Sequence, residues 1–244
     1  MDRTKQLMEV LNEIECTKSL EVYKTFKRLG NPRTTFHIYL NNYLDLKREI
    51  NIYYSETFEL ENGLVRRTSQ KSLIRRYHNF LSSARVFTAQ FVQEDFNDGF
   101  HCFIKELRNY SIHKNFFPLS SRFDMNQNGT SRYESIQINK IEEYLKEQIK
   151  NSKSRKKGLI NALVFLNSLK PVLNLNDLLE DYFQKMINEY HLIMHREIKE
   201  NRNELCTLVE VIDKVNHKMK ICGLKSPQVL SPSEIRYLRL ILEY

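Results

Sequence analysis

The chain has 244 residues, of which 41% are hydrophobic and 28% charged, so it has enough apolar material to bury a core. Six glycines and five prolines are too few for a sheet with many tight turns, and this composition favours a mostly helical protein. The formal charge of +8 suggests an anionic partner, with nucleic acid first and a membrane surface second.

The sequence lacks the signals of a secreted or membrane-spanning protein. Its first residues are charged and amphipathic, and no apolar run approaches the roughly 18 residues that a transmembrane helix needs. The four cysteines form no C-x-x-C pair and fit no zinc pattern, which indicates buried, reduced thiols. We therefore expect a cytoplasmic protein that uses no metal or other cofactor and does not bind a membrane.

The first half of the chain reads as helices separated by short breaks. Apolar residues at helical spacing predict a helix over 3–29, which Gly30-Asn31-Pro32 should end. Residues 35–55 begin with a strand-like alternation, but their later spacing favours a helix. The longest unbroken apolar stripe predicts a helix over 70–93, and another helix is expected over 95–113.

The second half begins with the only extended stretch, where Asn128-Gly129 suggests a small β-hairpin near 120–138. Asn174 or Asn176 can cap a long helix, and Gly223 suits a position just after a helix. Ser231 and Glu234 have capping-box spacing, with Pro232 at the first helical position. Further helices are predicted at 139–149, 158–170, from 174 to a break near 199–204, from 205 onward, and from 232 to the end.

These elements predict an all-α fold in three parts. We expect an N-terminal helical region over 1–68, a helical bundle over 69–222 and a C-terminal helix over 223–244.

A polar cluster marks the end of the predicted 95–113 helix, in the stretch "ELRNYSIHKNFFPL". On a helical wheel Arg108, Asn109 and His113 fall on the half away from an apolar stripe, so we expect them on the surface, together with His101 and Lys105. Arginine binds phosphate oxygens with two parallel hydrogen bonds, and histidine can transfer a proton near neutral pH. With the 2′-hydroxyl of RNA as nucleophile, such a set could cleave a phosphodiester without a metal. One histidine cannot readily serve both proton transfers, so a two-fold dimer is expected.

The motif also resembles a known family. "RNYSIH" resembles the R-[N/H/D]-x(3–5)-H signature of the HEPN superfamily, and "YHNFLSSARVFTAQF" resembles the long helix that precedes the motif helix in that family. The resemblance covers residues 70–120 and implies an HEPN-like up-and-down helical bundle, here with additional N- and C-terminal helices. It implies a homodimer whose interface holds the site, where Arg108 would contact the scissile phosphate, His113 would act as acid and base, and Asn109 would be a polar helper.

Many HEPN members are metal-independent endoribonucleases in toxin–antitoxin, abortive-infection and antiviral systems. The resemblance therefore implies RNA as the substrate, with an antitoxin or other defence-system protein as a further partner. A catalytically inactive HEPN-fold module that binds RNA, a nucleotide or a partner protein is the alternative, and a helical scaffold is a third hypothesis.

Several residues keep two interpretations. The motif itself could be a solvated helix end with a cationic cap. Contact with the RNA backbone and plain surface charge are both open for Lys105, Lys114, Arg75 and Arg76, and for the basic stretch "KSRKK" at 153–157. His191 and His195 have a spacing that could hold a metal, but no third ligand is evident, so a structural role is favoured.

Overall fold

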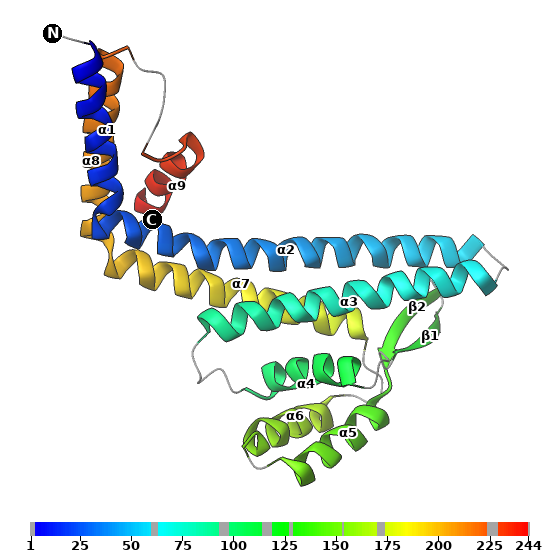
Figure 1. Ribbon diagram of the computed structural model, residues 1–244. Helices are drawn as coiled ribbons and strands as arrows, with labels where there is room; N and C mark the ends of the chain where they lie inside the picture. Colours follow the sequence, from blue (N-terminus) through cyan, green and yellow to red (C-terminus); the bar gives the residue numbers. More distant parts are fainter. Residues whose placement is uncertain are drawn as a thin grey trace. The chain divides into compact units, whose positions relative to one another are not determined.

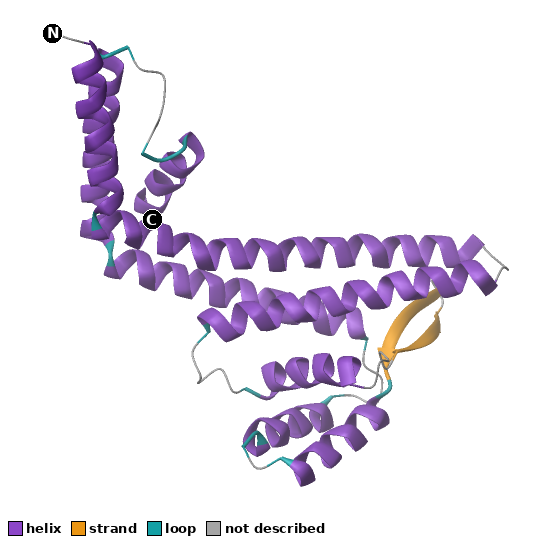
Figure 2. Ribbon diagram, viewed as in Figure 1, coloured by secondary structure: helices purple, strands orange, loops and turns teal. Residues whose placement is uncertain are grey.

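The computed structural model is helical throughout its described part, apart from one β-hairpin (Figures 1 and 2). The predicted all-α class is therefore confirmed. No helix in this part of the chain combines the length and the apolar character needed to cross a membrane. The structure describes residues 3–59, 63–92, 98–113, 119–126, 129–152, 154–169, 174–223 and 229–243.

The chain forms two compact units. A terminal unit combines residues 1–34 with 191–244, and a central unit comprises residues 35–190. Helices α2 (Glu21–Glu59) and α7 (Leu175–Glu200) each contribute residues to both units. These boundaries differ from the divisions at 68 and 222 that the sequence suggests, because the chain passes between the units within two continuous helices.

The terminal unit has a mainly aliphatic core that also includes Phe26. Helices α1 (Arg3–Ser19) and α8 (Arg202–Ile221) lie side by side, and α9 (Pro232–Glu243) packs against α8 (Figure 1). Among its cysteines, Cys16 and Cys206 are exposed, which corrects the expectation that the thiols are buried. The core of this unit includes Val10, Ile14, Leu29, Leu205, Leu208, Ile212, Val215, Leu230 and Leu238.

Three helix ends form as their local sequence predicts. Gly223 has a φ of 68° directly after the C-cap of α8, a conformation that glycine adopts without steric cost. At the start of α9, the Ser231 amide donates to Glu234 at 2.8 Å, and the Glu234 amide donates to the Ser231 hydroxyl at 3.3 Å. Asn174 caps α7, since its side-chain oxygen accepts the amide of Asn176 at 3.0 Å.

The predicted helix end at Gly30-Asn31-Pro32 is wrong, because α2 runs through Pro32 without a break. Proline removes one backbone donor, and this usually bends or ends a helix. Here Pro32 lies on the buried stripe of α2, whose members recur every three or four residues on both sides of it. The stripe consists of Phe26, Leu29, Pro32, Phe36, Tyr39, Tyr43, Leu46, Ile50 and Tyr53.

The central unit is held together by aromatic side chains. Helix α2 packs on α3 (Gly63–Phe91) and on α7 through stacked rings. The ring centroids of Tyr43 and Phe183 are 3.7 Å apart, and those of Tyr39 and Phe80 are 5.1 Å apart. Strands β1 (Leu119–Asn126) and β2 (Gly129–Ile136) pair antiparallel in the predicted hairpin region, with Asn126 opposite Gly129.

Helix α4 (Gly99–His113) packs against α3, α5 (Ile138–Asn151) and α6 (Lys156–Ser168). Phe100 of α4 stacks on Phe165 of α6 with 4.9 Å between ring centroids. Gly99 permits this contact, because a Cβ atom there would lie 2.8 Å from the carbonyl oxygen of Asn161 and 2.9 Å from Cβ of Phe165. The three neighbours of α4 determine which of its polar side chains reach solvent.

Candidate functional site

The three motif residues lie at the C-terminal end of α4 in different environments. Arg108 is partly exposed, and His113 is exposed as the last residue of the helix. Asn109 is only 4% exposed, which corrects the expectation that it lies on the surface. Because α3 and α6 also pack on α4, its buried face extends well beyond the apolar stripe visible in the sequence.

Asn109 joins two arginines to a carboxylate. Its side-chain oxygen accepts hydrogen bonds from Arg108 and from Arg85 of α3, each at 3.4 Å. Its side-chain nitrogen donates to Glu106 at 3.2 Å, and Glu106 in turn lies 3.9 Å from the guanidinium of Arg155. The carboxylate on one side and the two cations on the other fix the orientation of the amide.

Two like charges therefore meet at one amide oxygen. Burial and the nearby Arg85 lower the pKa of the Arg108 guanidinium from its usual value. Among the described residues neither of these guanidinium groups forms an ion pair, and Nε of Arg108 is buried without a hydrogen-bond partner. An anion with several acceptor oxygens would relieve the repulsion between Arg85 and Arg108 and use their remaining donors.

A second histidine lies close to this cluster. Ser111 donates its hydroxyl to the carbonyl oxygen of Arg108 at 2.8 Å, and the Nδ1 atom of His78 lies 3.3 Å from the same hydroxyl oxygen. With the serine proton so engaged, Nδ1 of His78 is the donor and Nε2 is the acceptor nitrogen of the neutral ring. Burial and then the charge of Arg108 lower the pKa of His78, so the neutral form is favoured.

Arg85, His78 and Glu106 are not among the site residues predicted from the sequence. His78 and Arg85 are seven residues apart on α3, which places them on the same face of that helix. This spacing is visible in the sequence, but nothing local indicates that the face meets α4. Glu106 is 4% exposed, and its burial depends on the packing of α4 in the fold.

The other residues that were predicted to contact RNA do not lie together in the structure. Arg75 is exposed, and Arg76 is engaged by Asp45 of α2 at 2.8 Å. These arginines precede Arg85 by nine or ten residues, or about 14 Å along α3. Lys105 is exposed on α4, whereas Lys114 lies outside the described residues.

His101 is not the surface residue that the helical wheel suggested. Its Nδ1 atom lies 2.7 Å from the hydroxyl oxygen of Tyr182. Burial, with the neighbouring Lys105 as a smaller cause, lowers its pKa to about 4, so the ring is neutral at pH 7. A neutral ring can accept the tyrosine proton at Nδ1, and we therefore assign His101 a packing role.

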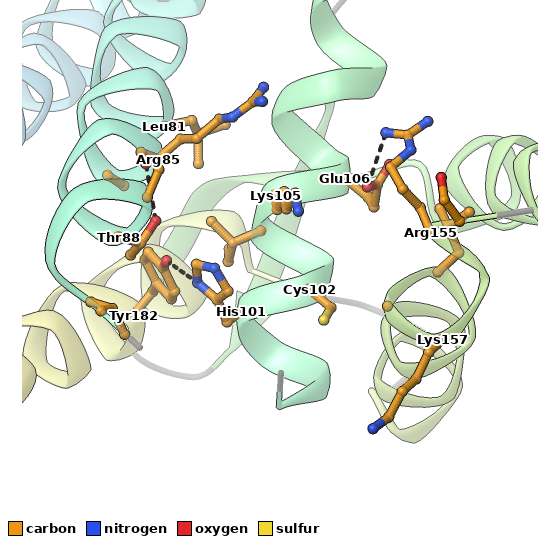
Figure 3. A pocket seen from close by; sticks show the side chains of 17 residues that line it. Leu81, Arg85, Thr88, His101, Cys102, Lys105, Glu106, Arg155, Lys157 and Tyr182 are labelled. Carbon is orange, nitrogen blue, oxygen red and sulfur yellow. Dashed lines mark hydrogen bonds and ion pairs between the residues drawn. The ribbon is translucent and has the colours of Figure 1, made fainter. Parts of the chain in front are cut away.

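A cavity of about 550 Å³ is lined by residues of α3, α4, α6 and α7 (Figure 3). We name it the α4 pocket. Helix α3 provides Arg85 on one side, and α6 provides Arg155 and Lys157 on the other. Lys105 and Glu106 of α4 lie between them. Arg85 and Glu106 thus belong both to the pocket and to the hydrogen-bonded cluster around Asn109.

Comparison of this chain with family models, curated proteins and solved structures finds no match. Among the described residues, no group of three or more histidine, cysteine, aspartate or glutamate side chains is arranged to hold a metal ion. What the site can do is therefore inferred from its own side chains.

Proposed function

We propose that the protein is a metal-independent endoribonuclease of the HEPN type that acts as a homodimer. The observation that carries this proposal is the pair of guanidinium groups on the oxygen of Asn109, which form no ion pair among the described residues. Such a pair suits a phosphodiester, whose two non-bridging oxygens share one negative charge and both accept hydrogen bonds. Phage defence or toxin action, with an antitoxin or other defence-system protein as partner, is the biological setting that the motif's resemblance suggests.

In the proposed reaction a bond forms between phosphorus and the 2′-oxygen, and the bond between phosphorus and the 5′-oxygen breaks. A base removes the proton of the 2′-hydroxyl, whose oxygen attacks the adjacent phosphorus, while an acid protonates the departing 5′-oxygen. The products are a 2′,3′-cyclic phosphate and a 5′-hydroxyl. Arg108 would stabilise the negative charge that grows on the phosphorane, and Asn109 would hold its guanidinium in place.

The geometry of a single α4 is the support for the proposed dimer. His113 lies five residues after Arg108, so the two side chains leave the helix about 7.5 Å apart along the axis and about 140° apart around it. One helix end therefore points the acid–base group and the phosphate-binding group in different directions. A two-fold pair of helix ends could bring His113 of one protomer toward Arg108 of the other and would supply two imidazoles.

The test is RNA cleavage in the presence of EDTA by the wild-type chain, by Arg108→Ala and by His113→Ala. We expect each variant to lose at least about 100-fold in cleavage rate, since each removes charge stabilisation or proton transfer in the transition state. Matched controls are Arg28→Ala and His195→Ala, which remove an exposed arginine and an exposed histidine elsewhere in the chain.

Two results would refute the proposal. Cleavage that needs an added metal would exclude the mechanism, and so would cleavage that both motif variants retain. RNA binding that falls steeply with salt but leaves the RNA intact would favour the inactive binding module instead. Sedimentation analysis of the wild-type protein tests the dimer separately, and a monomer at assay concentrations would remove the two-histidine arrangement.

A further inference from the structure

Within one protomer, the imidazole on the Arg108 side of α4 belongs to His78 of α3. Ser111 follows Arg108 by three residues, which places the two side chains about 60° apart around the helix. The Nδ1 atom of His78 lies 3.3 Å from the hydroxyl oxygen of Ser111. His113 leaves the same helix about 140° away from Arg108. The motif histidine is therefore not the imidazole that shares the face of the phosphate-binding arginine.

The ring of His78 is held in one orientation. Ser111 is only 1% exposed, and its hydroxyl is fixed by its bond of 2.8 Å to the backbone carbonyl of Arg108. Since this hydroxyl oxygen accepts the Nδ1 proton of His78, the nitrogen that can take up a proton is Nε2. A base whose far nitrogen is oriented by a third group is the arrangement that proton transfer to an active-site imidazole requires.

The protonation state of His78 also suits a base. Burial and then the charge of Arg108 lower the pKa of the imidazole from its usual value, so the ring is neutral at pH 7 and ready to accept a proton. The residue is only partly buried, which leaves part of it accessible from solvent. A phosphodiester held by Arg108 would bring the neighbouring ribose to this side of α4.

We propose that His78 is the general base of the cleavage reaction and acts beside Arg108 of its own protomer. This inference rests on the proposed function and assigns its two proton transfers to different histidines. Nε2 of His78 takes the proton of the 2′-hydroxyl as the bond between that oxygen and phosphorus forms. His113 of the other protomer gives a proton to the 5′-oxygen as its bond to phosphorus breaks. His78 then releases its proton to water, and His113 takes one up.

The deciding variants are His78→Asn and His78→Ala. The amide nitrogen of asparagine can replace Nδ1 as the donor to Ser111, but asparagine has no nitrogen that accepts a proton. We expect both variants to lose at least about 100-fold in RNA cleavage rate in EDTA, because each removes the base. Binding of RNA whose 2′-hydroxyls are methylated, which cannot be cleaved, should change less than about twofold, since Arg108 remains.

Two controls separate a catalytic role from a structural one. His37→Asn removes an exposed histidine of α2 in the same unit and should leave the cleavage rate unchanged. Added imidazole should raise the rate of His78→Ala at least about tenfold, because it restores a base at the vacant position, and should not restore Arg108→Ala. Thermal unfolding verifies that each variant is folded at the assay temperature.

Mixed dimers test which protomer supplies His78. Co-expressed chains that carry His78→Asn and His113→Ala should cleave RNA at least about tenfold faster than either variant alone, because one site of the mixed dimer keeps both histidines. A mixture of His78→Asn with Arg108→Ala should stay inactive, since no site then has both residues from one protomer.

The outcomes distinguish this inference from the proposed function. If the wild-type chain does not cleave RNA in EDTA, both are overturned. If it cleaves, the inference alone is overturned when His78→Asn keeps the wild-type rate, since the role of His78 would then be structural. Recovery of activity in the mixture of His78→Asn with Arg108→Ala, or no recovery in the mixture with His113→Ala, would also overturn it.

Discussion

The two compact units bury different kinds of side chain. The terminal unit has a mainly aliphatic core, and its buried Thr17 bonds to the backbone of its own helix, at the carbonyl of Glu13. The central unit buries Glu106 and Asn109 around α4 and connects them to arginines on other helices. Buried polar groups cost free energy unless they are paired, so their concentration around one helix points to a purpose other than stability.

Surface ion pairs occur in both units, and the central unit differs by two arginines that share one amide oxygen. In the terminal unit Arg239 pairs with Asp213 at 2.8 Å and Lys218 pairs with Glu13, all four at the surface. Such pairs contribute little, typically about 0–1 kcal/mol. In the central unit, Arg85 and Arg108 meet at an amide oxygen instead of a carboxylate. The terminal unit thus has the features of a packing module, and the central unit those of a site for an anion.

The largest expected effect is a pH dependence of stability from the central unit. The folded chain keeps His101 neutral down to a pKa of about 4, whereas an unfolded histidine titrates near 6.5. Between these values the unfolded chain binds more protons, so stability is complete above pH 6.5 and falls as the pH drops toward 4. The free energy of unfolding falls by an amount on the order of 3 kcal/mol over this pH range.

Thermal unfolding of His101→Gln and His195→Gln between pH 4 and 7 checks this expectation. His101→Gln should lose less stability on acidification than the wild-type chain, because glutamine has no titrating group. His195 is exposed in the terminal unit, and its substitution should leave the acid dependence unchanged. Equal acid dependence in wild type and His101→Gln would contradict the assignment.

The second prediction compares the loss of stability when one buried polar residue of each unit is replaced by alanine. Asn109→Ala should destabilise the chain by about 1–3 kcal/mol, because Glu106 loses a donor and two guanidinium groups lose their shared acceptor. Thr17→Ala removes one bond within a helix and should cost less than about 1 kcal/mol. Urea unfolding of both variants measures the difference, and similar losses would remove the contrast between the units.

A third expectation concerns the capping box of the terminal unit. Ser231→Ala should cost about 1 kcal/mol, since the amide of Glu234 loses its acceptor at the start of α9. RNA cleavage should not change at a temperature where the chain stays folded. If cleavage fell with this substitution, the terminal unit would have to take part in function.

The smallest expected effect is a change in the pKa of one histidine. Burial and the charge of Arg108 both lower the pKa of His78, so Arg108→Ala should raise that pKa, although burial keeps it below the usual value. Titration of the imidazole protons by NMR measures the change, with Arg28→Ala as the control. A pKa that does not rise would mean that Arg108 and His78 are not coupled in solution.

The features that the sequence predicted correctly are those that depend on residues adjacent in the chain. The glycine after α8 and the capping box of α9 both follow from local rules of helix geometry. Pro32 shows the limit of such rules, because proline usually ends a helix, yet it occupies a regular position in the buried stripe of α2. The position of a residue in such a stripe outweighed its own preference.

The candidate site was predicted only in part, because its remaining groups come together through the fold. The wheel for α4 treated its polar half as solvated, but α3 and α6 cover Asn109 and Glu106 there. Arg85 and Arg155 reach the site from helices whose contact with α4 no local pattern indicates. Burial of polar side chains is set by tertiary packing, which a one-sequence pattern does not contain.

The width of the α4 pocket depends on the absence of a side chain at Gly99. A methyl group at this position would lie 2.8 Å from the carbonyl oxygen of Asn161 in α6, closer than a Cβ atom approaches an oxygen, so the two helices would have to separate. Lys157 and Lys105, which stand on those two helices, would then no longer hold their present spacing. A larger side chain at position 99 would therefore widen the α4 pocket, and this single substitution is a route by which the pocket could accept a larger ligand.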